Sequence, residues 1–296
     1  MLDPDYELFA HIVQEGSISA AARAMRLSQA MASKRLARLE ARLGSQLIRR
    51  STRRMALTAT GAQFHADVVA ILSAVRAAEA RVLAGIGEPT GSLRIAAPTS
   101  FGRLYVAPIL ADFLTTYPKV TAELELSDDY SDLFKSGFDI AIRITNFLDR
   151  RLVAERLADS RRVLCAAPAY IERYGAPRLL SDLAQHRLLA ARGQMPWRLS
   201  RGTRDVSFSA ESSVLTNSSE VARELAVRGV GIALRSLWDV STELADGRLV
   251  RVLPEYEGSS GIFAVHPPSS HLPAATSAFI AALAKTFRPI PPWEHR

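Results

Sequence analysis

The chain has 296 residues, of which 48% are hydrophobic, and it carries a formal net charge of +7 at pH 7. This apolar fraction is enough to bury a substantial core, which excludes a disordered chain. The single cysteine, Cys165, excludes an intrachain disulfide and a cysteine-rich metal site. We expect Cys165 to be a small buried hydrophobe in a reducing compartment, with a redox role as the less favoured alternative.

The N-terminal residues indicate where the protein acts. The opening MLDPDYELF is acidic and lacks the basic and long apolar regions of a signal peptide. No run of about 18 or more apolar residues occurs, so no membrane-spanning segment is expected. The sequence therefore predicts a cytoplasmic protein without a membrane partner.

Most of the positive charge lies near the N-terminus. Residues 1–60 carry ten basic and five acidic side chains, so +5 of the net charge falls in the first fifth of the chain. The ten basic residues all lie between Arg23 and Arg54, where Glu40 is the one acid. This asymmetry indicates a nucleic-acid-binding end joined to a nearly neutral body. The alternative is a solvated basic face that has no partner.

Apolar residues spaced three and four apart predict three short helices, over residues 4–15, 18–25 and 28–43. Ser17 and Ser28 are good N-caps for the second and third helices. Gly16 and Gly44 are suited to end the first and third. Small alanines in the second helix allow the close approach that a tightly crossed helix pair requires.

The third helix is predicted to have two different faces. Its apolar face consists of Ala32, Leu36, Leu39 and Leu43. The opposite face is small, polar and basic, and it contains Ala30, Ser33, Lys34, Ala37 and Arg38, with Gln29 in the first turn. Such a face suits entry into a DNA major groove.

A wing, a long helix and a hinge are predicted next. The strand-like runs 46–48 and 55–57 flank the basic segment 49–54, which indicates a two-stranded wing. Thr58 or Thr60 then begins a helix that extends to about Ala84. Its length indicates a dimerisation helix, and burial against its own body is the alternative. Three glycines and a proline in residues 85–91 predict a flexible hinge.

Strands and helices alternate beyond the hinge. Strands are expected at 93–97, 120–126, 138–144, 163–167, 231–234, 249–253 and 261–266, and helices at 104–117, 132–135, 221–228 and 274–287. This alternation predicts an α/β fold with a mostly parallel sheet and helices on both faces. About 200 residues of it would divide into two subdomains with a cleft between them.

Several segments of the N-terminal region match a known pattern: GSISAAA at 16–22, LSQ at 27–29, Ser33 through Glu40, Leu43-Gly44, Leu47 and RRMALTATG at 53–61. With these segments, the whole chain resembles the LysR-type transcriptional regulators. LRIAAP at 93–98, FDIAIR at 138–143 and GVGIAL at 229–234 resemble the effector-binding domain of that family, which is built like a type II periplasmic binding protein.

The chain also departs from the family pattern at several positions. Many members have Pro at the position of Ala30 and Gln at that of Arg35, so the operator preference of a relative does not carry over. Arg235-Ser236 replaces an apolar pair, which puts a charge either at the mouth of the cleft or on the surface.

The resemblance implies a domain division. Residues 1–60 would form a winged helix-turn-helix, 61–85 a linker and dimerisation helix, 86–91 a hinge and 92–296 the effector-binding domain. Subdomain I would comprise about 92–162 with 267–296, and subdomain II about 163–266.

The resemblance makes the third helix the recognition helix in the major groove. We expect Gln29, Ser33 and Lys34 to reach base edges and Arg35 and Arg38 to contact phosphates. The remaining DNA-binding candidates are Ser17 through its backbone N–H, Ser28, Ala30, Arg53 in the minor groove and Arg54. For each residue the alternative is a solvated side chain. A dimer would bind an inverted-repeat operator on double-stranded DNA.

The resemblance places a small-molecule effector between the subdomains. Thr99 and Ser100 follow the first strand at a helix start, where an anion is favoured. Asn217 and Ser218 precede a second helix start, and the remaining candidates, Arg143 and Thr145, lie at a strand end. These residues favour a small polar or acidic metabolite, and a purely structural role is the alternative. Closure of the cleft would act through the hinge on the spacing of two DNA-binding heads.

No catalytic role or cofactor is expected. The chain has no Gly-x-Ser-x-Gly, phosphate-loop or Rossmann fingerprint, and its six histidines lack metal-ligand spacing. A bifunctional enzyme is a minor alternative. The stronger rival is a cytoplasmic solute-binding protein with a nonspecific basic N-terminus. Besides DNA and effector, the expected partners are a second copy of the chain, with pairing of dimers into tetramers left open, and RNA polymerase as a further candidate.

Overall fold

The computed structural model describes residues 3–50, 55–83, 88–128, 137–269 and 272–294. The chain divides into two compact units, which are described separately below. The first is Met1–Gly87 with Ser131–Asp139, and the second is Glu88–Tyr130 with Ile140–Arg296. Among the described residues, no helix is both long and apolar enough to cross a membrane.

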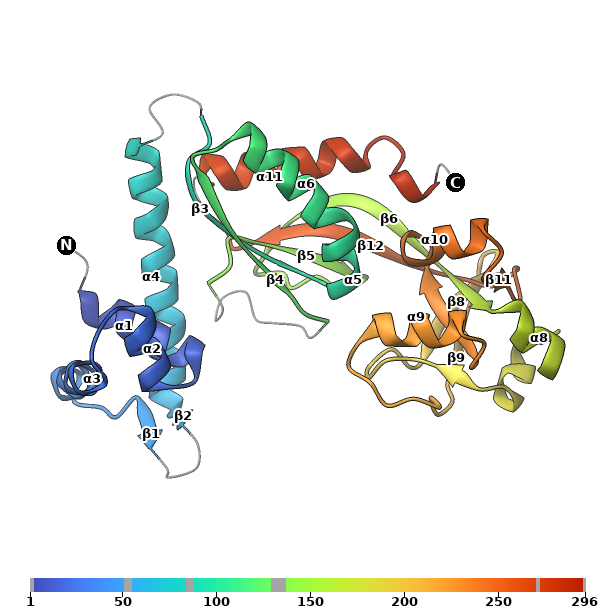
Figure 1. The fold of residues 1–296 in the computed structure, drawn as a ribbon, viewed down its shortest axis with the longest axis horizontal. Helices are drawn as coiled ribbons and strands as arrows, with labels where there is room; N and C mark the ends of the chain where they lie inside the picture. Colours follow the sequence, from blue (N-terminus) through green and yellow to red (C-terminus); the bar gives the residue numbers. More distant parts are fainter. Residues whose placement is uncertain (1–2, 51–54, 84–87, 129–136, 270–271, 295–296) are drawn as a thin grey trace. The chain divides into compact units, whose positions relative to one another are not determined.

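The first unit begins with the three predicted helices (Figure 1), α1 (Pro4–Glu15), α2 (Ile18–Ala24) and α3 (Gln29–Leu43). The hydroxyl of Ser17 accepts a hydrogen bond from Ala20 N at 3.4 Å, and that of Ser28 accepts one from Met31 N at 3.2 Å. Gly16 and Gly44 end α1 and α3 in the left-handed region, which glycine adopts without strain. The capping residues therefore confirm the predicted helix boundaries.

The three helices pack around a small core. Ala32, Leu36 and Leu39 of α3 are at most 1% exposed and contact buried residues of α1 and α2. Leu43 was expected on the same apolar face, but it is 37% exposed because α3 extends past the core at its last turn. The opposite face of α3 is thereby left in solvent.

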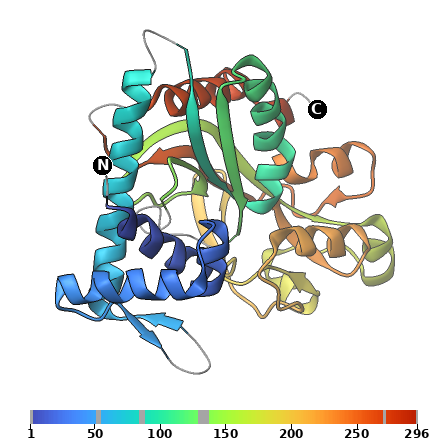
Figure 2. The ribbon, with the colours of Figure 1, turned by 60° about the vertical axis from the view of Figure 1, so that its left-hand side comes forward.

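A two-stranded wing follows, formed by β1 (Ile48–Arg50) and β2 (Met55–Leu57) in antiparallel pairing (Figure 2). The first strand begins two residues later than predicted, because Glu40 Oε1 accepts the N–H groups of Leu47 and Ile48 at 2.8 and 3.1 Å. Residues 51–54, which include the predicted wing tip with Arg53 and Arg54, lie outside the described residues.

The helix α4 (Ala59–Leu83) confirms the long helix that was predicted to begin at Thr58 or Thr60 and to extend to about Ala84. Its first half packs against the helix-turn-helix, since the ring of Phe64 lies 5.5 Å from that of Tyr6 and 5.6 Å from that of Phe9. Val68, Val69 and Leu72 are also buried. Part of the apolar stripe of α4 is therefore buried against the same chain, which was the alternative to dimerisation. Ile71 remains 44% exposed.

The second unit is built on a mixed sheet with the strand order β4-β3-β5-β12-β6-β10-β7. The strands are β3 (Gly91–Ala97), β4 (Val120–Leu126), β5 (Ile140–Thr145), β6 (Val153–Ala166), β7 (Leu188–Leu189), β8 (Trp197–Arg201), β9 (Arg204–Phe208), β10 (Ile232–Ser236), β11 (Val250–Arg251) and β12 (Glu257–His266). The pairs β3–β4, β3–β5 and β7–β10 are parallel, but β12 is antiparallel to both β5 and β6, and β6 is antiparallel to β10. The prediction of a mostly parallel sheet was wrong, because two long strands cross the sheet in opposite directions.

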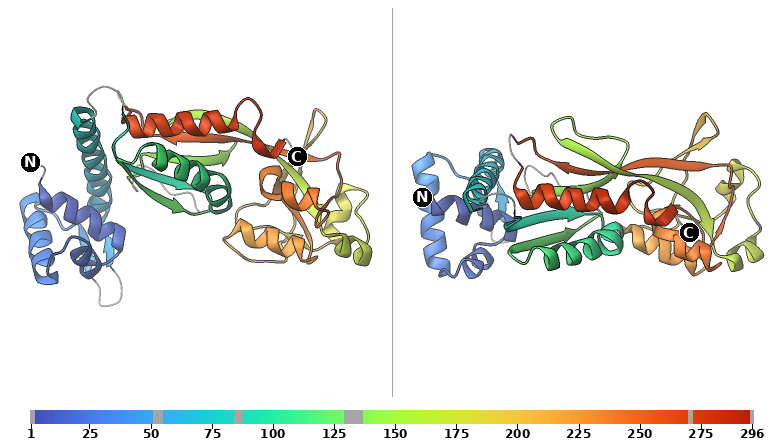
Figure 3. Two further views of the ribbon diagram at one scale, coloured as in Figure 1. Left: turned by 45° about the horizontal axis from the view of Figure 1, so that its top comes forward. Right: turned by 90° about the horizontal axis from the view of Figure 1, so that it is seen from above.

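Two hydrophobic cores lie along β6, which runs side by side with β12 (Figure 3). Strand β6 contributes Leu157 to the first core and Leu164 to the second. Strand β12 pairs with β6 along its whole length, and its Ile262 and Ala264 lie in the first core. Strand β6 therefore connects the two cores, and β12 pairs with it throughout.

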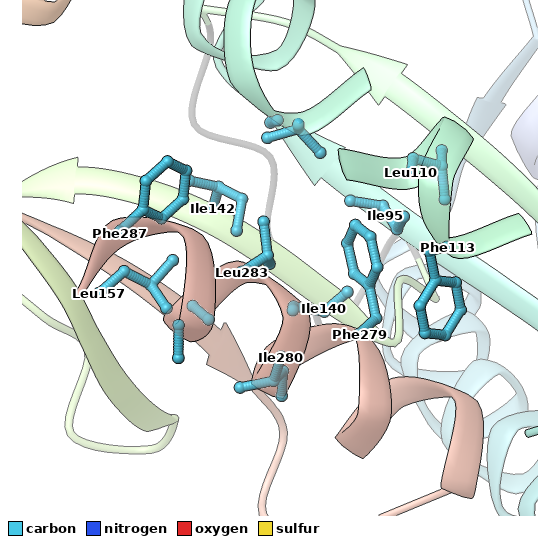
Figure 4. Close-up of a cluster of buried hydrophobic side chains, with 14 of the residues drawn as sticks. Ile95, Leu110, Phe113, Ile140, Ile142, Leu157, Phe279, Ile280, Leu283 and Phe287 are labelled. Carbon is cyan, nitrogen blue, oxygen red and sulfur yellow. The ribbon is translucent and has the colours of Figure 1, made fainter. Parts of the chain in front are cut away.

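Helices cover the sheet. They are α5 (Thr99–Phe101), the π-helical turn η1 (Gly102–Val106), α6 (Ala107–Thr116), α8 (Pro168–Tyr174), the 3-10 turn η2 (Leu180–Gln185), α9 (Ser219–Val227), α10 (Leu237–Ala245), α11 (Ala274–Phe287) and the 3-10 turn η3 (Pro292–Glu294). Figure 4 shows Phe279, Leu283 and Phe287 of α11 turned toward Ile140 and Ile142 in the first core. The bounds of α11 are those predicted. The predicted helix at 132–135 lies outside the described residues.

Candidate DNA interface and effector site

The exposed face of α3 carries the residues expected to read bases. Gln29, Ala30 and Lys34 are exposed and Ser33 is half-buried, while Ala32 and Leu36 point into the core. Met31, which the sequence reasoning did not select, is 52% exposed on the first turn. An apolar side chain at a groove-facing position can contact a thymine methyl group, so its place on a helix with a basic face would have been a usable signal.

The two arginines expected to bind phosphate are held by a buried carboxylate. Asp5 is 2% exposed, and its Oδ1 accepts from Arg35 Nε at 2.6 Å. Its Oδ2 accepts from Arg38 Nε at 3.0 Å and Nη2 at 2.6 Å. The side chain of Arg35 is only 16% exposed, whereas that of Arg38 is 67% exposed. Both arginines therefore tie α3 to α1, and Arg38 is the more exposed of the two.

The predicted residues outside the recognition helix are placed differently. The hydroxyls of Ser17 and Ser28 are used for helix capping, as described above, and Ser17 Oγ also lies 2.8 Å from Ser19 Oγ. Arg49, on the first strand of the wing, is exposed. Arg53 and Arg54 lie outside the described residues. The wing therefore presents at least one cation beside α3.

Two of the effector candidates, Thr99 and Ser218, lie where subdomain I meets subdomain II. Thr99 opens the continuous helical run α5–η1–α6 after β3, and Ser218 directly precedes α9 of the second subdomain. Helices α5 and α9 approach each other (Figure 1). The carboxylate of Asp128 joins them, because Oδ1 accepts from Thr99 N at 2.9 Å and Oδ2 accepts from Ser219 N at 2.8 Å.

Two further contacts cross the same junction. Arg103 of η1 pairs with Glu220 of α9, with Nη2 and Oε1 2.5 Å apart. The hydroxyl of Tyr105 donates to the carbonyl of Trp238 at 2.8 Å. The two subdomains are therefore linked by polar contacts from three different side chains.

The other predicted effector residues are only partly brought together. Ser100 is 1% exposed and its hydroxyl has no hydrogen-bond partner among the described residues. The parallel register Ile95↔Ile140 carries Arg143 to the level of Pro98, at the carboxyl end of β3. Thr145 is used locally, since its hydroxyl accepts from Phe147 N at 3.0 Å. Asn217 is exposed, and Ser218 N donates to Thr216 Oγ1 at 3.0 Å.

Arg235 lies neither at a cleft mouth nor on the surface. It is 4% exposed, and its Nε and Nη2 donate to Asp239 Oδ2 at 2.8 and 2.5 Å. Nearby, Arg223 Nη1 donates to Glu243 at 2.8 Å. A buried charge is tolerated when it is paired in this way, so Arg235 is a structural residue of the second subdomain.

Cys165 is fully buried in the sheet, as expected of a small hydrophobe. Burial is the main cause that raises the pKa of its thiol to about 12. Because the thiolate is the reactive form of cysteine, a thiol with this raised pKa has low reactivity.

A hollow of about 740 Å³ lies elsewhere on the second unit and contains none of the predicted effector residues. Its lining includes Arg156, Arg161 and Arg288. Each of these arginines is paired with a carboxylate, from Asp159, Glu294 and Glu155 respectively. The hollow thus offers little uncompensated charge, and the junction at Asp128 remains the better candidate for effector binding.

A winged helix-turn-helix with a polar, basic recognition face, followed by a two-subdomain α/β domain, defines the class of DNA-binding transcriptional regulators. Residues 4–62 match the family model of the bacterial regulatory helix-turn-helix protein, lysR family, and residues 86–288 match the LysR substrate binding domain. The chain therefore belongs to the LysR family of transcriptional regulators.

Named relatives and solved structures agree with this assignment. The chain is 35% identical to the HTH-type transcriptional activator TtdR of Escherichia coli (strain UTI89 / UPEC) over 269 residues, covering 90% of this chain and 87% of the relative. It is 34% identical to the regulator PtxR of Pseudomonas aeruginosa, covering 93% and 89%. The full-length structure of the virulence activator AphB of Vibrio cholerae aligns with a TM-score of 0.67 and 25% identity, covering 96% of this chain and 99% of that one.

Proposed function

We propose that this LysR-family regulator binds a specific inverted-repeat operator on double-stranded DNA through α3. The observation that supports the proposal best is the division of α3 into a buried face and an exposed face with Gln29 and Lys34. Gln29, Ser33 and Lys34 read bases in the major groove, and Arg38 binds phosphate. The wing, with Arg49 and the predicted Arg53 and Arg54, binds the backbone and the adjacent minor groove.

The operator is an inverted repeat because the active form is at least a dimer. Helix α4 supplies the interface, and Ile71 is the exposed apolar residue among its described side chains beyond Val69. A symmetric dimer presents two recognition helices to two half-sites related by a twofold axis. The proposed division is a DNA-binding head at 1–60, a linker at 61–85, a hinge at 86–91 and an effector domain at 92–296.

The second unit binds a small polar or acidic effector at the junction of its subdomains. Support comes from the backbone N–H groups of Thr99 and Ser219, which converge there, and from Arg143 near the carboxyl end of β3. Effector binding changes the angle between the subdomains, and this change alters the spacing of the DNA-binding heads. Such coupling requires that the effector bind one arrangement of the subdomains more tightly than the other. The chain acts by binding and not by catalysis, in the cytoplasm, with RNA polymerase as a candidate partner.

Selection of bound sequences from a randomised duplex library by the full-length chain tests this function. We expect enrichment of a twofold-symmetric motif whose half-sites lie about one helical turn apart, or a multiple of it. Lys34→Ala should select a motif that is relaxed at one base position of each half-site, whereas Arg248→Ala, which removes an exposed charge from the second unit, should select the unaltered motif. Recovery of no common motif by the unaltered chain would refute the proposal.

A further inference from the structure

The anion position at the subdomain junction is already occupied by the protein itself. A carboxylate with one oxygen on Thr99 N and the other on Ser219 N, at 2.9 and 2.8 Å, uses both N–H groups at normal hydrogen-bond distances. Ser219 is the first residue of the nine-residue helix α9, where the helix dipole favours negative charge. Asp128 thus makes the contacts that were expected of an acidic effector.

The same carboxylate holds two subdomains together. Thr99 leads into the helix whose Phe101 lies in the first core, while Ser219 leads into α9, whose Ala222 lies in a core of the second subdomain. The two donors are 29 and 91 residues away from Asp128 in sequence. The bridge is therefore a tertiary contact across the junction.

A second feature at the same place lacks a partner. Ser100, the residue after Thr99, is 1% exposed, and within the described part of the chain its hydroxyl forms no hydrogen bond. Buried hydroxyls are nearly always hydrogen-bonded in folded proteins. The hydroxyl of Ser100, next in the chain to a residue that binds Asp128, therefore has unused hydrogen-bonding capacity.

We propose that Asp128 is a resident anion of the effector site, and that a small carboxylate effector binds by displacing it from the N–H groups of Thr99 and Ser219. The inference rests on the proposed function, in which this junction is the effector site. An anionic ligand beside an unmoved Asp128 would meet like-charge repulsion, and the two N–H donors would already be used. Displacement removes both obstacles and releases the bridge between the subdomains.

Displacement of Asp128 breaks a contact between the two subdomains, so it lets the effector alter their arrangement. The effector's own carboxylate takes over the two N–H groups, while Asp128 is freed from α9. Differential contact with the bridged and unbridged forms is the requirement for a conformational switch. Asp128 also favours anionic ligands, because a charged oxygen competes better than a neutral one for the two donors.

The test uses the full-length chain, with succinate as the probe and Asp149→Ala as the matched control. Asp149 is an exposed carboxylate paired with Arg151, so its removal changes the net charge equally without touching the junction. We expect Asp128→Ala to bind succinate about tenfold more tightly than the unaltered chain, and Asp149→Ala to bind it unchanged. Asp128→Asn, which preserves size but loses charge and one acceptor, should shift affinity in the same direction and serves if the alanine variant does not fold.

Amide hydrogen exchange independently measures whether Asp128 protects the N–H groups of Thr99 and Ser219. The amides of Thr99 and Ser219 should exchange about tenfold faster in Asp128→Ala than in the unaltered chain, and succinate should restore their protection. Unchanged succinate affinity in both Asp128 variants, or unchanged protection of both amides, would overturn the proposal. Neither measurement includes DNA, so failure here is separate from failure to select an operator, which would count against the proposed function instead.

Discussion

At the scale of single residues, Asp5 determines how the recognition helix is held. It is nearly fully buried and accepts hydrogen bonds from both Arg35 and Arg38. Burial acts to raise the pKa of Asp5, but the hydrogen bonds and charges of the two arginines outweigh it and hold that pKa below its ordinary value. The ion pairs link α1 to the middle of α3, so the position of the exposed face of α3 depends on a buried residue of another helix.

Replacing Asp5 should therefore destabilise the DNA-binding head. Asp5→Ala leaves Arg35 partly buried without its partner, and we expect a loss of about 3 kcal/mol in the free energy of unfolding, measured with urea at about pH 7. Because the folded pKa is depressed, the contribution of Asp5 is fully present above about pH 4 and is lost as the pH falls through the folded pKa. Asp67→Ala, an exposed carboxylate on α4, is the control, and equal losses in the two variants would contradict this account.

The base-reading residues and the phosphate-binding residue should separate in binding assays. Gln29→Ala or Lys34→Ala should cost about 1–3 kcal/mol on the preferred operator and relax discrimination at one base position. Arg38→Ala should weaken binding to all sequences about equally and reduce its salt dependence. Fluorescence anisotropy against matched and mismatched duplexes measures both effects, and a uniform loss for Gln29→Ala would argue against base contact there.

At the scale of elements, the start of α4 is hydrogen-bonded to the residues just before β1. Thr58 N donates to Leu47 O at 3.0 Å, and Thr58 Oγ1 both donates to Gln46 O at 2.8 Å and accepts from Gly61 N at 2.9 Å. A Cβ atom on Gly61 would lie 2.0 Å from Leu47 O. The chain just before β1 and the first turn of α4 therefore approach so closely that a side chain at position 61 would clash with backbone.

Gly61→Ala tests this junction. The added methyl group meets backbone and not a flexible side chain, so the strand and helix must separate, at an expected cost of about 1–3 kcal/mol in unfolding free energy. Thermal or urea denaturation of the full-length chain provides the measurement. The nearby exposed Gln63→Ala should change stability by no more than about 0.5 kcal/mol, and a similarly small effect of Gly61→Ala would show that the close contact is unimportant.

The elements that could be predicted from sequence were those with a local signal. Helices α1, α3 and α11 have apolar residues at helical spacing, and capping residues also mark the ends of α1 and α3. Strand β6 was predicted only at its end, because its first half is mostly exposed and reads as polar loop. The antiparallel course of β12 beside β6 depends on contacts about 100 residues apart, which the order of strands and helices along the chain does not specify.

The residues of the candidate sites also fall into those that the sequence could predict and those that it could not. The exposed residues of α3 follow from helical periodicity and from the family pattern, so they could be named in advance. Asp5 and Asp128 could not, because their partners are 30 to 33 and 29 to 91 residues away and are specified only by the fold. Asp128 also changes the expectation for the effector site, since the predicted anion position contains a carboxylate of the chain itself.

At the scale of the whole molecule, the proposal requires association through α4. Each chain has a mass of 32.3 kDa, so a dimer would sediment with twice that mass. Ile71→Lys places a charge on the exposed apolar stripe and should shift the equilibrium toward the monomer in analytical ultracentrifugation. Gln63→Lys, on the same helix and exposed, should leave the dimer intact. A dimer equally stable in both variants would place the interface elsewhere.

The central claim is that α3 reads a symmetric operator. The most direct measurement is footprinting of the DNA upstream of the gene for this chain and of its divergent neighbour. We predict protection of an inverted repeat with half-sites related by a twofold axis, and loss of that protection in the Gln29→Ala, Lys34→Ala double variant. Protection that has no symmetry, or that persists unchanged in the double variant, would contradict the account.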